Sequence, residues 1–77
     1  MFRLIYFNAS FGYKGFDYKD DTQYTLAEQT AKSQDAAIIC VVDYQNKAIL
    51  KKCPDFNMHL EHIDHIIFDP KVMGLYY

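Results

Sequence analysis

The three histidines of this chain lie close together near its C-terminal end. His59, His62 and His65 follow one another at intervals of three residues, with Glu61 and Asp64 between them. Imidazole and carboxylate groups are common ligands of zinc in proteins. The cluster is therefore the first place in the sequence to look for metal chemistry.

The spacing of these histidines does not match a known metal-binding motif. On a helix, each step of three residues leaves a residual rotation of about 60°, so three rings spread over a broad sector. The H-E-x-x-H pattern of metalloproteases is missing. A neighbouring pair of histidines, with Asp64 or with Cys53 folded nearby, would form a set of ligands. The alternative is a polar helix face, and we expect no bound metal or cofactor.

Other groups that could act as nucleophiles or bases have no evident partner. Cys40 lies in an apolar run, where burial raises the pKa of a thiol and makes it inert. Ser10 and Ser33 have no neighbouring base, and the Asp20-Asp21 pair suits the start of a helix. Cys40 and Cys53 are expected to be reduced thiols, and they share a sheet face only if the connection between their strands is even-numbered. The sequence predicts a protein that is not an enzyme.

The composition predicts one small folded domain. Hydrophobic residues make up 51% and aromatic residues 17% of the 77 residues, which argues against disorder. A core of this size gains stability from docking on a partner or from forming a homodimer. The formal net charge of −2 does not favour binding to nucleic acid or to an anionic membrane. The apolar segment 1–7 is too short for a signal peptide, so we expect a cytoplasmic location.

The elements that must position these groups are organised around residues 25–52. Thr25 and Glu28 fit a capping box and predict a helix from Thr25 to about Asp35. Its inner side would carry small or uncharged residues, namely Leu26, Ala27, Thr30, Ala31 and Gln34. The β-branched run 36–42 predicts a buried central strand. A turn over 43–47, with Asn46 suited to a left-handed conformation, leads to a strand over 48–53 that Pro54 ends.

The flanking segments complete the predicted sheet. Residues 2–9 form a strand that is apolar on both faces, which suits a central position. Gly12 and Gly15 predict a turn before a short edge strand over 16–19. A helix over 58–68 with Asn57 as its cap should end before Pro70, and 72–77 would add a strand or an extended segment.

Together these elements predict an α+β fold. It is an antiparallel sheet of three or four strands with the main helix packed on one face, in the order β(β)αββ plus a short C-terminal helix or strand. The layout of residues 4–7, 25–34 and 38–52 resembles that of small phage-encoded proteins, including some anti-CRISPR proteins and phage antitoxins. This resemblance implies an inhibitor that binds the surface of a larger host complex, in the host cytoplasm.

The leading hypothesis is therefore a small protein-binding module whose partner is a larger protein or complex. Tyrosines interleaved with charges between residues 13 and 21 are typical of such contacts, and Tyr13 and Tyr18 are expected to be partly exposed. The predicted contact residues are Tyr13, Lys14, Asp17, Tyr18, Asp20 and Asp21. One alternative is a metal-binding domain that uses the three histidines. The other is a nucleic-acid-binding module that uses Lys47, Lys51 and Lys52.

Overall fold

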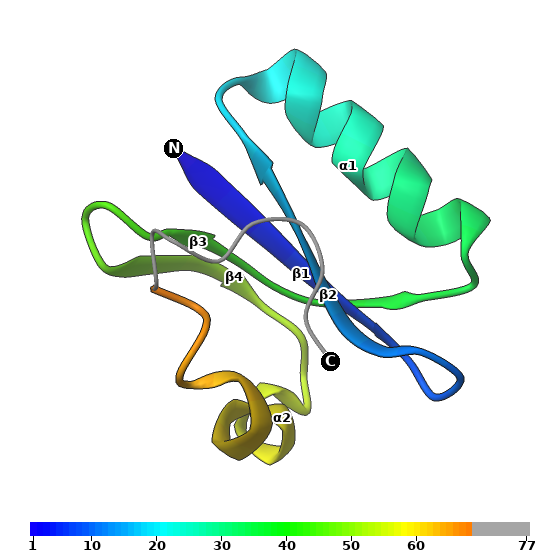
Figure 1. Ribbon diagram of the computed structural model, residues 1–77. Coiled ribbons are helices and arrows are strands. Elements are labelled where there is room, and N and C mark those ends of the chain that lie inside the picture. Colours follow the sequence, from blue (N-terminus) through cyan, green and yellow to red (C-terminus); the bar gives the residue numbers. More distant parts are fainter. Residues whose placement is uncertain (69–77) are drawn as a thin grey trace.

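A computed structural model describes residues 1–68 as a four-stranded sheet with two helices (Figure 1). In chain order the elements are β1 (Phe2–Asn8), β2 (Gly12–Tyr18), α1 (Asp21–Ser33), β3 (Ala37–Asp43), β4 (Ala48–Lys52) and α2 (Phe56–Ile63). The strands are antiparallel and lie in the order β2-β1-β3-β4. The predicted α+β class and the central positions of β1 and β3 are confirmed.

The two central strands carry apolar side chains on both faces, and this property determines the layers. Leu4, Ile5 and Tyr6 are consecutive residues of β1, and all three are buried. Because neighbouring side chains of a strand point to opposite faces, both faces of β1 must be covered. Figure 1 shows α1 on one side of the sheet and α2 on the other.

Helix α1 covers the first face with small side chains. Ala27 and Ala31 are fully buried against Leu4, Tyr6 and Val41. Two alanines one turn apart allow a helix to lie close to a sheet. The predicted stripe was wrong in one member, because Leu26 is 54% exposed and lies on the outer side of the helix.

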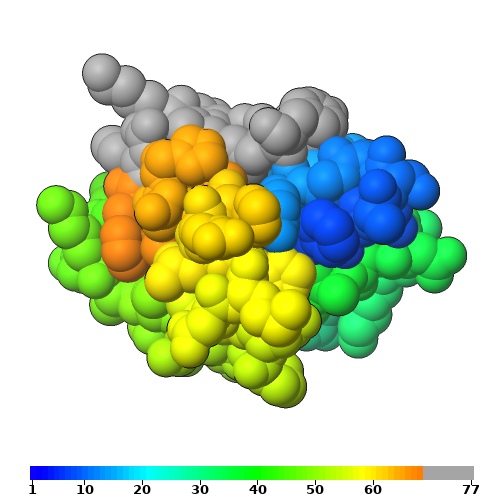
Figure 2. Space-filling view, turned by 90° about the horizontal axis from the view of Figure 1, so that it is seen from below, coloured from blue at the N-terminus to red at the C-terminus, as the bar shows by residue number. Residues whose placement is uncertain are grey.

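Helix α2 and the turns that follow it cover the second face. Phe56 and Ile63 of α2, with Ile66 and Ile67 beyond it, pack against a cluster that includes Ile5 of β1. Figure 2 looks onto this side of the molecule, where the side chains of α2 lie in front. The predicted C-terminal helix therefore exists, and it covers the face of the sheet opposite α1.

Two irregularities in strand pairing determine which side chains reach each face. Ile5 pairs with Cys40 but Tyr6 pairs with Ile38, so Ile39 is an extra residue in β3. Such a bulge places two consecutive side chains on one face, and Ile39 and Cys40 both join the α2-side core. A second bulge makes Leu50 the extra residue of β4.

The start of the main helix differs from the prediction. Helix α1 begins at Asp21, four residues earlier than expected, and its N-cap is Asp20, whose carboxylate accepts from the Gln23 backbone N–H at 3.0 Å. Thr25 lies inside the helix, where its hydroxyl donates to the Asp21 carbonyl. An Asp N-cap satisfies a free N–H of the first turn. The helix therefore begins at the Asp20 cap, and the predicted capping box of Thr25 and Glu28 does not form.

The turns also differ in detail. The first turn lies at residues 9–11 rather than 12–15, and Gly12 has a φ of 85° at the start of β2. In the second turn the left-handed residue is Lys47, not Asn46; the Asn46 side chain instead donates to Asp43 at 2.7 Å. Helix α2 spans Phe56–Ile63 rather than 58–68, so Asn57 lies within it. The predictions for Pro70 and for residues 72–77 lie outside the described residues.

A buried arginine joins three parts of the fold. The Arg3 side chain has no exposed surface, and it forms a bidentate ion pair with Asp17 of β2 at 2.7 and 3.0 Å. It also donates to the carbonyl of Ile66 at 2.6 Å, and its guanidinium carbon lies 4.4 Å from the centre of the Tyr44 ring. A buried charge requires such partners. Arg3 therefore links β1, β2 and the segment that follows α2.

We predict that Asp17→Asn lowers the free energy of unfolding by about 3 kcal/mol, because breaking one side of a buried ion pair leaves the other charge uncompensated. Urea unfolding followed by circular dichroism measures this change. Lys32→Gln, which removes an exposed pair with Glu28, is the control and should have a much smaller effect. Equal effects of the two substitutions would contradict the structural role of Arg3.

Candidate functional site

Three side chains that can ligate a metal converge where β4 passes into α2. The backbone N–H of Cys53 donates to the Ile39 carbonyl at 2.9 Å, which extends the β3–β4 pairing by one residue. Pro54 follows, and Asp55 is the N-cap residue of α2. His59 lies one helical turn further on, so its ring returns to the same side as Asp55.

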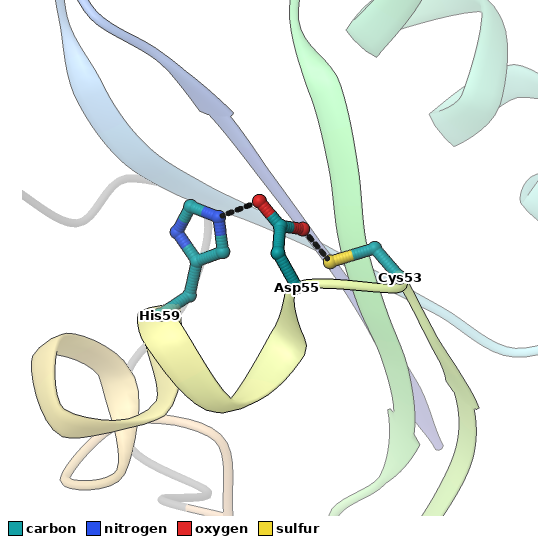
Figure 3. Close-up of side chains that lie close together, drawn as sticks. All are labelled: Cys53, Asp55 and His59. Carbon is teal, nitrogen blue, oxygen red and sulfur yellow. Dashed lines mark hydrogen bonds and ion pairs between the residues drawn. The ribbon is translucent and has the colours of Figure 1, made fainter.

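The contacts among these residues form a chain (Figure 3). The Cys53 thiol donates to one carboxylate oxygen of Asp55 at 2.9 Å, and His59 Nε2 lies 3.2 Å from the other oxygen. One ligand atom from each of the three residues lies within 4.8 Å of those of the other two. Within residues 1–68 this is the one group of three or more such side chains that meets this distance. We call it the Cys53–His59 cluster.

Strand β2 fixes the orientation of the histidine in this cluster. The hydroxyl of Tyr13 lies 2.7 Å from His59 Nδ1, so both ring nitrogens have a partner. The Tyr13 ring also contacts the rings of Phe7 and His62, with centres 4.6 and 6.1 Å away. The orientation of the His59 ring is thus set by Tyr13 and Asp55, which lie far apart in the sequence.

The side chain of Asp55 does not cap helix α2, although Asp55 is the N-cap residue of that helix. Its side chain accepts no hydrogen bond from the first turn of α2, although aspartate is a favoured N-cap residue. The carboxylate contacts Cys53 and His59 instead. These two hydrogen bonds, the one from Cys53 first, lower the pKa of Asp55.

The order of groups argues against a thiol nucleophile. Activation of a cysteine requires a base or a positive charge next to the sulfur. Here a carboxylate lies between the thiol and the imidazole, and burial together with that carboxylate raises the pKa of Cys53. A thiol, a carboxylate and an imidazole facing one another are instead a set of ligands for a borderline-soft cation.

The structure separates the three predicted histidines. His59 belongs to the cluster, whereas His62 and His65 are exposed and lie beside Glu61 and Asp64 at 3.5 and 3.8 Å. Cys53 is near His59, as in one of the sequence alternatives, but that alternative also needed a second histidine, and neither His62 nor His65 belongs to the cluster.

Asp55 was not predicted from the sequence to belong to a ligand set. The signal for it was the spacing C-x-D-x-x-x-H across a strand end and one helical turn.

A second feature lies on the α1 side of the sheet. It is a solvent-open hollow of about 290 Å³ between β4 and the start of α1. Its walls are mostly aromatic or aliphatic, with charged groups among them; the lining residues are Phe2, Tyr18, Asp20, Asp21, Tyr24, Val41, Leu50 and Lys51. We call it the α1-side hollow.

The predicted contact residues are divided between the two sides. Tyr18, Asp20 and Asp21 line the α1-side hollow, whereas Tyr13 lies beside His59. The side chain of Asp17 is 9% exposed because it pairs with Arg3.

The structure also gives the surroundings of Lys14, and it changes one expectation, for Tyr18. Lys14 lies over the ring of Phe11, with its Nζ 4.3 Å from the ring centre. Tyr18, which we expected to be partly exposed, is 5% exposed, and burial raises its pKa to about 12. The six residues therefore do not form one surface.

The lysines proposed for nucleic acid are also divided. Lys51 contacts Tyr24 on the α1 side, with its Nζ 3.3 Å from the hydroxyl. Lys52 lies over the ring of Phe56, at the start of α2. Lys47 is in the turn between β3 and β4. Lys51 and Lys52 thus face opposite sides of the sheet and do not line one groove.

Comparisons with protein-family models, curated proteins and solved structures found no match for this chain. Within residues 1–68, neither helix has the length and apolar character needed to cross a membrane.

The two cysteines should differ sharply in reactivity. Both are free thiols on the α2 side of the sheet, but Cys40 is fully buried and Cys53 is partly exposed. Burial raises the pKa of Cys40 to about 12, so little thiolate forms at pH 8. We predict that native protein with excess iodoacetamide at pH 8 gains one adduct, at Cys53, measured by mass spectrometry. Cys53 should react more slowly than a fully exposed thiol, because burial and the Asp55 carboxylate raise its pKa as well.

The control for this prediction is Cys53→Ser, which should gain no adduct until denaturant is added. Modification of Cys40 in the native protein at a rate similar to that of Cys53 would contradict the buried position of Cys40.

Proposed function

We propose that this protein is a small non-enzymatic protein-binding module and that the α1-side hollow receives a side chain of its partner. The observation that carries the proposal is the composition of the hollow. Aromatic and aliphatic walls next to charged groups are the pattern of a binding hot spot. Three of the six contact residues expected from the sequence, Tyr18, Asp20 and Asp21, line it.

The open shape of the hollow favours a protein ligand over a small molecule. Small-molecule pockets occupy about 300–1,000 Å³ and enclose most of the ligand. The α1-side hollow, at about 290 Å³, is close to the lower end of this range, but it is open to solvent and would not enclose a small ligand. That space suits one large apolar side chain of a protein whose remaining surface covers the rim.

The aromatic walls of the α1-side hollow are held in place by ring contacts and hydrogen bonds. Phe2 and Tyr18 stack with ring centres 5.5 Å apart, and the Tyr24 ring lies 5.5 Å from that of Tyr18. Tyr24 donates to Glu28 at 3.0 Å and accepts from Lys51 at 3.3 Å. Pre-organised aromatic walls lose little side-chain entropy on binding.

The charges around the hollow indicate what the partner should present. Asp20 and Asp21 are exposed at the start of α1, whereas Lys51 already contacts Tyr24. Acidic groups on the rim favour a basic group on the partner. The proposed partner surface therefore has a large apolar side chain next to a lysine or arginine.

The proposed target is a host defence or regulatory complex, following the resemblance in layout to phage-encoded inhibitors. The proposed location is the cytoplasm, of the host cell if the chain is phage-encoded. Two free cysteines are compatible with a reducing compartment.

Leu50 tests the proposal because it lines the hollow and is 54% exposed. We predict that Leu50→Asp abolishes capture of a stoichiometric protein from bacterial lysate, with the bound protein identified by mass spectrometry. In titrations with the purified partner, loss of a hot-spot side chain costs about 2 kcal/mol or more, roughly a 30-fold loss of affinity.

Leu26→Asp is the matched control, because Leu26 is also 54% exposed but lies on the outer side of α1. It should retain the partner. Equal capture by wild type and Leu50→Asp would overturn the proposal, as would capture of nothing but a second copy of this chain.

A further inference from the structure

We propose that Cys53, Asp55 and His59 bind one Zn²⁺ ion, with a water molecule as the fourth ligand. This site is on the opposite side of the sheet from the α1-side hollow and does not depend on the protein-binding proposal. Tyr13 acts as a positioning residue for His59.

The spacing of the three side chains fits a tetrahedral zinc ion. Zinc lies about 2.3 Å from sulfur and about 2.0–2.2 Å from nitrogen and oxygen, so neighbouring ligand atoms are about 3.3–3.6 Å apart. In the cluster the thiol–carboxylate and imidazole–carboxylate distances are 2.9 and 3.2 Å, and the three ligand atoms lie within 4.8 Å of one another. Small changes in side-chain torsion angles are enough to place an ion between them.

The charges also match. A thiolate and a carboxylate next to a neutral imidazole carry two negative charges, which Zn²⁺ neutralises. When the ion binds, the Cys53 proton that now points to Asp55 is released to solvent, because the thiolate is the form that ligates a metal. Asp55 is the residue in the middle of the cluster, and it already turns its carboxylate toward Cys53 and His59 rather than to the helix N-terminus.

The contact between Tyr13 and His59 resembles the support of zinc ligands in other proteins. A metal-bound histidine uses one ring nitrogen for the metal and hydrogen bonds through the other, which fixes the ring orientation. In this chain Nε2 faces the cluster and Nδ1 faces the Tyr13 hydroxyl at 2.7 Å. With zinc bound to Nε2, the ring proton is on Nδ1, and this N–H donates a hydrogen bond to the hydroxyl oxygen of Tyr13.

The experiment is a zinc titration of the full chain purified without an affinity tag. We expect one Zn²⁺ per chain by elemental analysis after dialysis. With Co²⁺ as a spectroscopic substitute we expect thiolate-to-metal charge-transfer absorption. Tyr13→Phe should weaken zinc binding by roughly 10- to 100-fold, as loss of an outer-shell partner does. Cys53→Ser and His59→Gln should weaken it further.

His65→Gln is the matched control for His59→Gln, because it removes an exposed histidine outside the cluster. Circular dichroism of each variant verifies that it is folded. Three results would overturn the proposal: zinc well below one ion per chain, an equal loss of affinity in His65→Gln and His59→Gln, or charge-transfer absorption that persists in Cys53→Ser.

Discussion

The fold depends on the apolar character of β1 and β3 on both faces. A strand that is apolar on one face needs a single cover, and the other face can meet water. Leu4 and Val41 face α1, whereas Ile5 and Val42 face the side of α2, and all four are buried. The sheet therefore needs two separate covers, and the chain of 77 residues supplies them with α1 from its N-terminal half and α2 from its C-terminal half. This three-layer arrangement gives each side of the molecule its own surface chemistry.

Helix α2, which covers the second face, is held against the sheet by a hydrogen bond as well as by apolar contacts. Arg3 is buried in the central strand, and one of its hydrogen bonds goes to the carbonyl of Ile66, just beyond α2. This bond and the packing of Phe56 and Ile63 hold α2 against the sheet at both ends. The position of α2 in turn sets the distance between Cys53, at the end of β4, and His59, inside the helix. The geometry of the Cys53–His59 cluster is thus a consequence of how the second face is covered.

The sequence predicted the elements and their order well, because patterns of apolar residues are local. It predicted the central strands from their continuous apolar runs and the main helix from its periodicity. It failed where two local signals competed, as when the Asp20 cap prevailed over Thr25 at the start of α1. It also failed where strand register determines which face of the sheet a side chain joins. The bulges at Ile39 and Leu50 change that face, and no local pattern predicts them. The contact between Tyr13 and His59 spans 46 residues, and no local pattern encodes it.

The sheet separates a hollow on the α1 side from a cluster of possible metal ligands on the α2 side. The most direct test is a Zn²⁺ titration of isotope-labelled protein followed by two-dimensional ¹H–¹⁵N NMR. We expect saturable shifts of the amide signals of Tyr13, Cys53, Asp55 and His59, with those of Tyr24 and Leu50 unchanged. Shifts centred on His62 and His65, or shifts of similar size around the hollow, would contradict it.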